Sequence, residues 1–326
     1  MGCAFSVPST KLPSIGTAAL HNLAPPIVTG VSFWTWQLLV AVAINAVVQA
    51  IQIGAYAARL AGVRTGRIAT SISLFNLFVT ASRLAMLVYT LMLGPISDAA
   101  GHAVAVLQSP RAHALWSSAA LQADIASIQT TYQWQLRAII FGGLVGTLLG
   151  ALLLPMFTYL YVRGVRSFER TKSLPHSMLR LLDFRVLGDV LSHIRLPRLA
   201  EFRTFSTRGI PRRLLVFNVV VTGVYAVGVV AAYYASVIDI NVARTAIGTS
   251  GIINGVGTIA FTFFVDPTSS IIVDEAVKGE RPHEQVKSMV FYLALTAAVG
   301  WALSQLILVP SAEIIAFVAH LVNHGR

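Results

Sequence analysis

Six stretches of the chain are apolar and long enough to cross a bilayer, and they determine its architecture. A membrane-spanning helix needs about 20 predominantly apolar residues, each of which adds about 1.5 Å to its length. The stretches that meet this requirement are residues 33–60, 68–93, 136–162, 214–240, 243–265 and 288–309. The pattern therefore predicts an all-α fold, a polytopic membrane helix bundle with about six transmembrane helices.

The composition agrees with this prediction. Of the 326 residues, 56% are hydrophobic and 11% are charged, whereas about 25% of the residues of a soluble domain are charged. A net charge of +11 would indicate a nucleic-acid partner in a soluble protein. Here the basic residues gather between the spans, which favours a role in membrane topology. The single cysteine, Cys3, excludes an internal disulfide framework and a multi-cysteine metal site.

The segments between the spans divide the chain into four parts. We expect an extracytoplasmic N-terminal segment (1–32), a first three-helix half (33–162), a basic cytoplasmic loop (163–213) and a second three-helix half (214–326). Residues 95–136 are of mixed polarity, and their apolar pieces are too short to span. They predict an extracytoplasmic loop with one or two short helices that lie on the bilayer.

The loop of residues 163–213 holds twelve Arg or Lys residues against four Asp or Glu residues. Within it, Leu179, Leu182, Val186 and Val190 recur at helical spacing. This spacing predicts an amphipathic helix on an anionic leaflet. The alternative is that the basic residues only fix topology.

The distribution of basic residues predicts the orientation. Eighteen Arg and Lys residues fall on the side of the long loop, and five fall on the side of the two termini. The positive-inside rule then places the long loop in the cytoplasm and both termini outside. The chain is thus expected to be a multi-pass membrane protein with both termini on the extracytoplasmic side.

The two halves are compatible with an inverted 3+3 repeat, because three spans per half make them antiparallel. The pattern Arg67-x-Ala-Thr-Ser precedes Asn76, and Arg244-x-Ala-x-x-Thr-Ser precedes Asn254. If the repeat holds, the helices that carry Asn76 and Asn254 should meet near a pseudo-two-fold axis. Substrate would bind there.

Arg83 lies near the middle of the second span. An arginine at that depth costs about 2.5–3.5 kcal/mol on insertion scales, so it normally faces a wet cavity or a bundle interior. We interpret Arg83 as facing a polar cavity where it meets an anionic group. The alternatives are a structural arginine paired with an acid, and one whose head reaches the membrane interface.

Two glycine and proline patterns predict local structure. Gly142, Gly146 and Gly150 form a tandem small-xxx-small pattern, which lets another helix approach closely. Asp266-Pro267 is expected to break the backbone, so that a half-helix end faces the cavity. The alternative there is ordinary capping by Asp266, with Glu280 and Arg281 as a solvated pair.

Common enzymatic motifs are missing from the sequence. It holds no Walker-type loop, no HExxH and no G-x-S-x-G. Nucleotide hydrolysis and metal-dependent hydrolysis by those routes are excluded, and no cofactor or metal is indicated.

Three segments together resemble a known family: RTGRIATSISLFNLFVTASRLA (64–85), GIINGVGTIAFTFFVDPTSSIIVDEAVKGERPHEQVKSMV (251–290) and LILVPSAEIIAF (306–317). They are similar to the Amj family, bacterial lipid II flippases that act as an alternate to MurJ. The likeness covers most of the chain. It implies translocation of undecaprenyl-pyrophosphate-linked peptidoglycan precursor from the inner to the outer leaflet of the bacterial cytoplasmic membrane for cell wall synthesis, with lipid II and membrane lipids as partners.

With that substrate, the polar residues of the spans acquire expected roles. A guanidinium matches phosphate bidentately, so Arg83 is expected to bind the pyrophosphate and Arg67 to receive it at the cytoplasmic side. Asn45, Asn76 and Asn254 are expected to bind sugar or peptide groups. The residues expected to gate or couple the cavity are Asp266, Asp274, Glu313 and Arg281.

Two other functions remain open from the sequence. One is an integral membrane enzyme acting on polyprenyl (pyro)phosphates, for which Ser82-Arg83 resembles a Ser-Arg phosphate site without the glycines and prolines expected around it. The other is a non-transporting membrane scaffold whose basic loop recruits a partner. The first alternative, an enzyme acting on polyprenyl (pyro)phosphates, would need a general acid/base or a nucleophile beside the residues that bind its phosphate.

Overall fold

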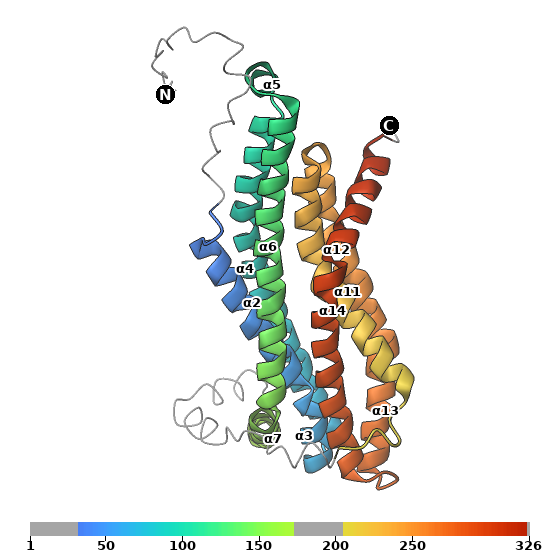
Figure 1. Cartoon of the computed structure of the whole chain (residues 1–326). Coiled ribbons are helices and arrows are strands. Elements are labelled where there is room, and N and C mark those ends of the chain that lie inside the picture. Colours follow the sequence, from blue (N-terminus) through green and yellow to red (C-terminus); the bar gives the residue numbers. More distant parts are fainter. Residues whose placement is uncertain (1–31, 173–204, 325–326) are drawn as a thin grey trace.

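The computed structural model describes residues 32–172 and 205–324, apart from the side chains of Arg83 and His324 (Figure 1). Within these residues every regular element is helical. Six helical segments are long and apolar enough to cross a membrane, which confirms the predicted polytopic all-α bundle. The amphipathic helix predicted around Leu179–Val190 and the N-terminal segment up to residue 31 lie outside the described residues.

The helices of the first half are α2 (Trp36–Ala55), α3 (Ala57–Thr65), α4 (Ile68–Leu107), α5 (Pro110–Leu115), α6 (Ser118–Leu152) and α7 (Leu154–Thr171). Those of the second half are α11 (Arg212–Ile238), the short η1 (Ile240–Val242), α12 (Ala243–Ala260), the π-helical turn η2 (Phe261–Val265), α13 (Asp266–Val277) and α14 (His283–His324).

In the first half, α2 packs against both α4 and α6. The predicted close approach is confirmed at the glycines of α6, where a Cβ on Gly146 would lie 2.0 Å from the carbonyl oxygen of Ala46. Gly142 and Gly150 approach the backbone of Val42 and Ala50 in the same way. Only glycine allows this backbone contact between α2 and α6.

The second half repeats this packing order, because α11 packs against both α12 and α14. Here Gly300 of α14 makes the close approach, since a Cβ on it would lie 2.8 Å from the carbonyl oxygen of Val219. The third helix of each half therefore contacts the first through glycine. The inverted repeat itself stays a prediction.

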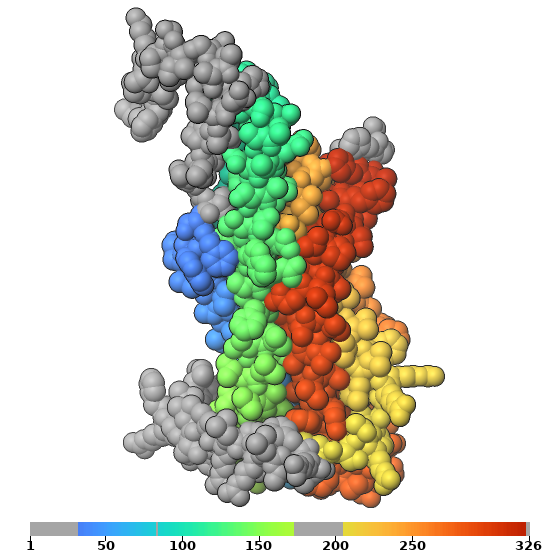
Figure 2. Space-filling model, viewed as in Figure 1, coloured from blue at the N-terminus to red at the C-terminus, as the bar shows by residue number. Residues whose placement is uncertain are grey.

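The halves join along α6 and α14, which lie side by side over the visible face of the molecule (Figure 2). Gly143 leaves room for the ring of Trp301, and a Cβ there would lie 2.3 Å from that ring. The side-chain amide of Gln305 donates to the carbonyl of Arg137 at 2.9 Å, and the Arg137 guanidinium donates to the carbonyl of Gln305. This exchange fixes the register between α6 and α14.

Residues 95–136 differ from the expected loop. Pro95 lies inside α4, which continues to Leu107, and α6 already begins at Ser118. Only residues 108–117 lie outside these long helices, and they include the short α5 at one end of the bundle (Figure 1). The physical reason is that Ile96, Ala100 and Val104 continue the buried stripe of α4 in the core. Neighbouring helices make a proline tolerable there.

The third span also differs from its predicted range. It ends at Leu152, and α7 follows as a separate helix that crosses the end of the bundle and is seen end-on in Figure 1. Pro155 lies in the first turn of α7, where its missing N–H carries no penalty. The helix is amphipathic: its buried face includes Leu154, Phe157, Tyr161 and Val165, and its basic residues are Arg163, Arg166 and Arg170.

The charged stretch 266–287, which follows the predicted fifth span (243–265), is largely helical. The fifth span continues through η2 into α13 up to Val277, and α14 starts at His283. Burial of Ile272, Val273 and Ala276 explains the extension. Farther on, α14 passes through Pro310, so Glu313 lies in one continuous helix.

Candidate functional site

One end of the bundle, formed by α3, α7, the start of α11 and the α13–α14 turn, collects most of the described basic residues; we call it the basic end (Figure 1). Its Arg and Lys residues are Arg59, Arg64, Arg67, Arg163, Arg166, Arg170, Lys172, Arg208, Arg212, Arg213, Lys278, Arg281 and Lys287. The opposite end carries α5, the α11–α12 connection and the end of α14.

A pocket of about 210 Å³ lies near the basic end, between α3, α4 and α13. Both halves of the chain line it, since α3 and α4 belong to the first half and α13 to the second. Its polar lining consists of Arg59, Ser71, Asn76, Asp266 and Ser270. The apolar lining includes Ile68, Ile72, Phe75 and Val273.

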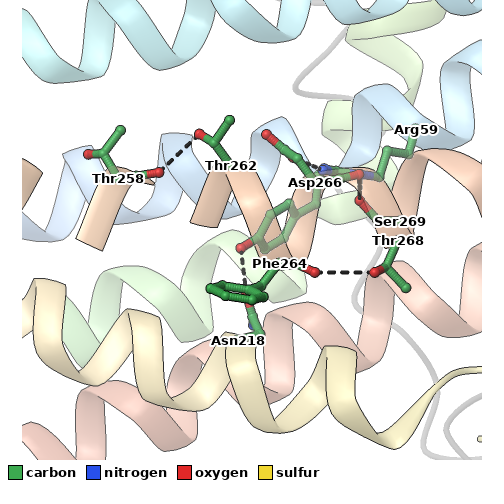
Figure 3. Close-up of polar contacts among 9 residues, drawn as sticks. Arg59, Asn218, Thr258, Thr262, Phe264, Asp266, Thr268 and Ser269 are labelled. Carbon is green, nitrogen blue, oxygen red and sulfur yellow. Dashed lines mark hydrogen bonds and ion pairs between the residues drawn. The ribbon is translucent and has the colours of Figure 1, made fainter. Parts of the chain in front are cut away.

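Arg59 of α3 is the central cation of this pocket, and its side chain is only 9% exposed. Its Nη2 donates to Oδ1 of Asp266 at 2.7 Å, and its Nε donates to the hydroxyl of Ser269 at 3.1 Å (Figure 3). The guanidinium carbon lies 5.3 Å from the ring centroid of Tyr56 and 5.2 Å from that of Phe75. Two aromatic rings and one carboxylate thus hold the charge in place.

The hydrogen bonding of Arg59 is incomplete. Its Nη1 is buried and has no hydrogen-bond partner among the described residues. Buried donors are normally satisfied, so an exception calls for an explanation. Arg59, a lining residue of the pocket, therefore keeps one unused charged donor, which is itself buried.

Asp266 begins α13 directly after the π-helical turn η2. Pro267 lacks an N–H and cannot continue the α-helical hydrogen bonding, and the hydroxyl of Thr268 donates to the carbonyl of Phe264 at 3.2 Å. Aromatic stacks flank the turn: Phe261 on Tyr56 at 6.4 Å and Phe264 on Phe217 at 4.6 Å. Such turns occur frequently at functional sites. The predicted backbone disruption at Asp266-Pro267 thus takes the form of a π turn within a continuous span.

A buried polar contact links the halves beside this site. The Tyr56 hydroxyl donates to Oδ1 of Asn218 in α11 at 3.3 Å. Asn218 in turn donates to the carbonyl of Leu293 and to the hydroxyl of Thr296, both at 2.8 Å. The junction of α2 and α3 is therefore connected to α11 and α14 through one tyrosine.

An exposed polar face of α4 continues from the pocket toward the middle of the span. Ser73, Asn76 and Thr80 share this face by their three- and four-residue spacing, and all three are exposed. Position 83 follows on the same face by helical register. Asn76 belongs both to this face and to the pocket lining, so the two polar features are continuous.

Among the predicted substrate-binding residues whose side chains the structure describes, only Asn76 lines the pocket. Arg67 lies at the basic end, exposed and paired with Glu169 of α7 at 2.7 Å. Asn45 is buried between helices, donating to the carbonyl of Ile139 at 2.9 Å. Asn254 lies on α12, where its side-chain oxygen is buried with no partner among the described residues. Arg83 lies in α4, and its side chain is outside the described residues.

Of the four residues predicted to gate or couple the cavity, Asp266 alone lines the pocket. Asp274 pairs with Lys278 at 2.6 Å, and this hydrogen bond and charge raise the pKa of the Lys278 ammonium. Arg281 pairs with Glu275 and donates to the carbonyl of Gly209 at 2.8 Å. Glu313 is exposed on α14, away from the basic end.

Sequence reasoning missed Arg59, which it treated as one of the basic residues that set topology. A signal was available, because an acid in a span demands a counter-charge and Asp266 follows an apolar run directly. The partners Tyr56, Asn218 and Ser269 had no comparable signal. Among the described residues, no three His, Cys, Asp or Glu side chains gather to hold a metal ion.

Comparisons with known proteins identify the family that this chain resembles. The family model described as Amj, "Alternate to MurJ", matches residues 44–319. The chain is 32% identical over 286 residues to the lipid II flippase Amj of Bacillus subtilis (strain 168), an alignment that covers 87% of this chain and 97% of that relative. No solved structure matches the chain significantly.

Proposed function

Because the chain belongs to the Amj (Alternate to MurJ) family, we propose that it is a lipid II flippase of the bacterial cytoplasmic membrane. It moves the undecaprenyl-pyrophosphate-linked peptidoglycan precursor from the inner to the outer leaflet. The name of the Bacillus subtilis relative describes transport, which supports a transporter over an enzyme acting on polyprenyl phosphates.

The substrate sets a physical requirement that the protein must meet. Its sugar-peptide head and its anionic pyrophosphate cannot cross hydrocarbon unaided, because unpaired polar and charged groups are costly there. Its polyprenyl tail, by contrast, is apolar and dissolves in the hydrocarbon core of the bilayer. The protein must therefore offer the head a polar path while the tail remains outside.

The observation that carries the proposal is the pocket between the halves. It contains a buried arginine and a carboxylate at the basic end, and through Asn76 it continues into the polar face of α4. By the positive-inside rule we place the basic end in the cytoplasm, where the precursor is made. Both termini are then extracytoplasmic.

The residues of the path have proposed roles. Arg67 receives the pyrophosphate at the basic end, Asn76 and Asn254 bind the head group, and Arg83 binds the pyrophosphate deeper in the span. Asp266 acts as the gate. Asn45 is left out of the path, because its amide already bonds α2 to α6.

Complementation tests this function in a bacterium depleted of its own lipid II flippases. The wild-type chain is expected to restore growth, and Arg83→Ala is expected to fail although it inserts into the membrane normally. Arg111→Ala, on exposed α5, is the matched control and should behave as wild type.

Two results would contradict these assignments. No rescue by a well-expressed wild-type chain would exclude the flippase, and release of phosphate from undecaprenyl pyrophosphate would then indicate an enzyme. Rescue by Arg83→Ala at the wild-type rate would remove Arg83 from the path while keeping the function.

A further inference from the structure

Arg59 is held in a geometry suited to a second anion. Its Nη2 and Nε are used by Asp266 and Ser269, while its buried Nη1 has no partner among the described residues. The carboxylate contact is monodentate, because Oδ1 of Asp266 meets one nitrogen only. A guanidinium whose N–H groups are satisfied on one edge and unsatisfied on the other can donate hydrogen bonds to further acceptor oxygens.

The pocket beside Arg59 has room for such an anion. Its volume is about 210 Å³, whereas one water takes up about 30 Å³ of the liquid. Of the remaining polar groups of the lining, Asn76 and Ser270 carry amide and hydroxyl donors, whereas the Ser71 hydroxyl already donates to the carbonyl of Ala58. A phosphate group offers more acceptor oxygens and more negative charge than one carboxylate, and guanidinium pairs with it bidentately.

Asp266 is placed to compete with that anion. It is one-third exposed and lies in the pocket lining, so an incoming phosphate reaches the same guanidinium. It is also the first residue of α13, directly after the π-helical turn. Exchange of Asp266 for a phosphate at Arg59 would remove the ionic contact between α3 and α13, on the two halves of the chain.

We propose that Arg59 binds the pyrophosphate of the polyprenyl lipid at the cytoplasmic side, between its reception at Arg67 and its binding at Arg83, and that Asp266 occupies Arg59 until the lipid displaces it. The inference rests on the proposed function and deepens it. The lipid is recognised by its diphosphate, and its binding releases α13 from α3 at the π-helical turn. Lipid binding is thereby coupled to movement between the halves.

Binding to the purified full-length protein in lipid nanodiscs tests the proposal. The probes are undecaprenyl pyrophosphate, undecaprenol without phosphate, and inorganic pyrophosphate. Arg59→Gln is expected to weaken binding of undecaprenyl pyrophosphate at least tenfold. Arg64→Gln, an exposed arginine on the same helix outside the pocket, is the matched control and should change binding less than twofold.

Asp266→Asn gives the decisive result, because it removes the competing charge and keeps the shape. We expect it to bind undecaprenyl pyrophosphate about tenfold more tightly and to flip lipid more slowly. A merely structural ion pair predicts no gain in affinity. Unchanged or weaker binding by folded Asp266→Asn would therefore overturn the proposal.

A second variant covers the case in which Arg59→Gln fails to fold because Asp266 is left unpaired. Replacing both partners, Arg59→Met with Asp266→Leu, removes the buried pair without leaving a lone charge, which proteins often tolerate. This double variant should fold and lose binding to the same extent. Wild-type affinity in the folded double variant would contradict the proposal.

The probes also separate the sources of the phosphate. Undecaprenol should not compete, and inorganic pyrophosphate should compete only at concentrations at least a hundredfold higher than the lipid. Equal affinity for the inorganic anion would contradict a lipid site.

If wild type rescues growth but Arg59→Gln and Asp266→Asn bind the lipid like wild type, the proposed site is wrong and the proposed flippase function is retained. If lipid binding depends on Arg59 but the wild-type protein does not flip lipid II, the proposed function is wrong and the proposed binding site is retained.

Discussion

Three asparagines that each lie within an apolar span of the sequence have different surroundings in the folded protein. Asn45 is buried and bonds α2 to the carbonyl of Ile139 in α6. Asn76 is exposed in the pocket lining, and Asn254 has a buried side-chain oxygen with no partner among the described residues. A polar residue in a span is therefore either a contact between helices or part of a path for substrate, and the neighbours decide which.

This difference predicts opposite effects for two alanine variants. Asn45→Ala should lower the free energy of unfolding by about 0.6 kcal/mol, and by at most about 1.7 kcal/mol, as for other hydrogen bonds between membrane helices. It should leave lipid flipping unchanged. Denaturant unfolding in detergent and flipping in proteoliposomes are the two measurements.

Asn76→Ala is the counterpart, and it should reduce flipping several-fold with unchanged unfolding. Its side chain is exposed, so no contact between helices is lost. A large stability loss in Asn76→Ala, or a large flipping loss in Asn45→Ala, would reverse the two assignments.

At the scale of elements, glycines serve different purposes on α6 and on α12. On α6, Gly142, Gly146 and Gly150 contact the backbone of α2 directly. On α12, Gly248, Gly251 and Gly255 have nothing within 4 Å of an added Cβ. The same residue type thus makes a tight helix pair in one half and leaves an open helix face in the other.

Alanine at these positions should therefore change stability with opposite signs. Gly146→Ala places a Cβ 2.0 Å from the Ala46 carbonyl and should destabilise the protein by about 1–3 kcal/mol through overpacking. Gly251→Ala meets open space and should be neutral or stabilise by up to about 1 kcal/mol, because alanine favours helix. Thermal unfolding of the two variants in one detergent measures the difference. Equal melting temperatures would mean that α2 and α6 do not touch at Gly146.

At the scale of the whole molecule, charge is concentrated at one end and the two halves meet over the pocket. The basic end holds α3, α7 and the α13–α14 turn, and the end of α14 lies at the opposite end together with α5 (Figure 1). Ion pairs at the basic end tie its elements together, as Arg67 with Glu169 and Arg59 with Asp266 do. A protein built in this way has one preferred orientation in a membrane.

Cysteine labelling checks that orientation. In a Cys3→Ser background, Ala114→Cys on α5 and Glu280→Cys in the α13–α14 turn place one exposed thiol at each end. A membrane-impermeant maleimide should label Ala114→Cys on intact spheroplasts. Glu280→Cys should react only after the membrane is opened. The reverse pattern would place the basic end outside and contradict the proposed direction of transport.

The local pattern of apolar residues and glycines was sufficient to predict much of the fold. Apolar length located the six spans, and Gly142, Gly146 and Gly150 indicated a close helix contact that the structure confirms. The ends of helices were less predictable: Pro95 and Pro310 lie inside helices, and Asp266 continues a span. In each case burial of the following apolar residues outweighs the local preference of proline or of charge for ending a helix.

The sequence by itself determined that this protein crosses a membrane several times, where its basic residues collect and to which family it belongs. These properties depend on hydropathy along the chain and on the identity of residues, both of which are local. Only the tertiary structure decided that Asp266 pairs with Arg59, 207 positions away in the sequence, and that α3, α4 and α13 enclose a pocket around them. Such pairing depends on how helices distant in sequence pack, and the hydropathy of the chain does not specify which helices will be neighbours.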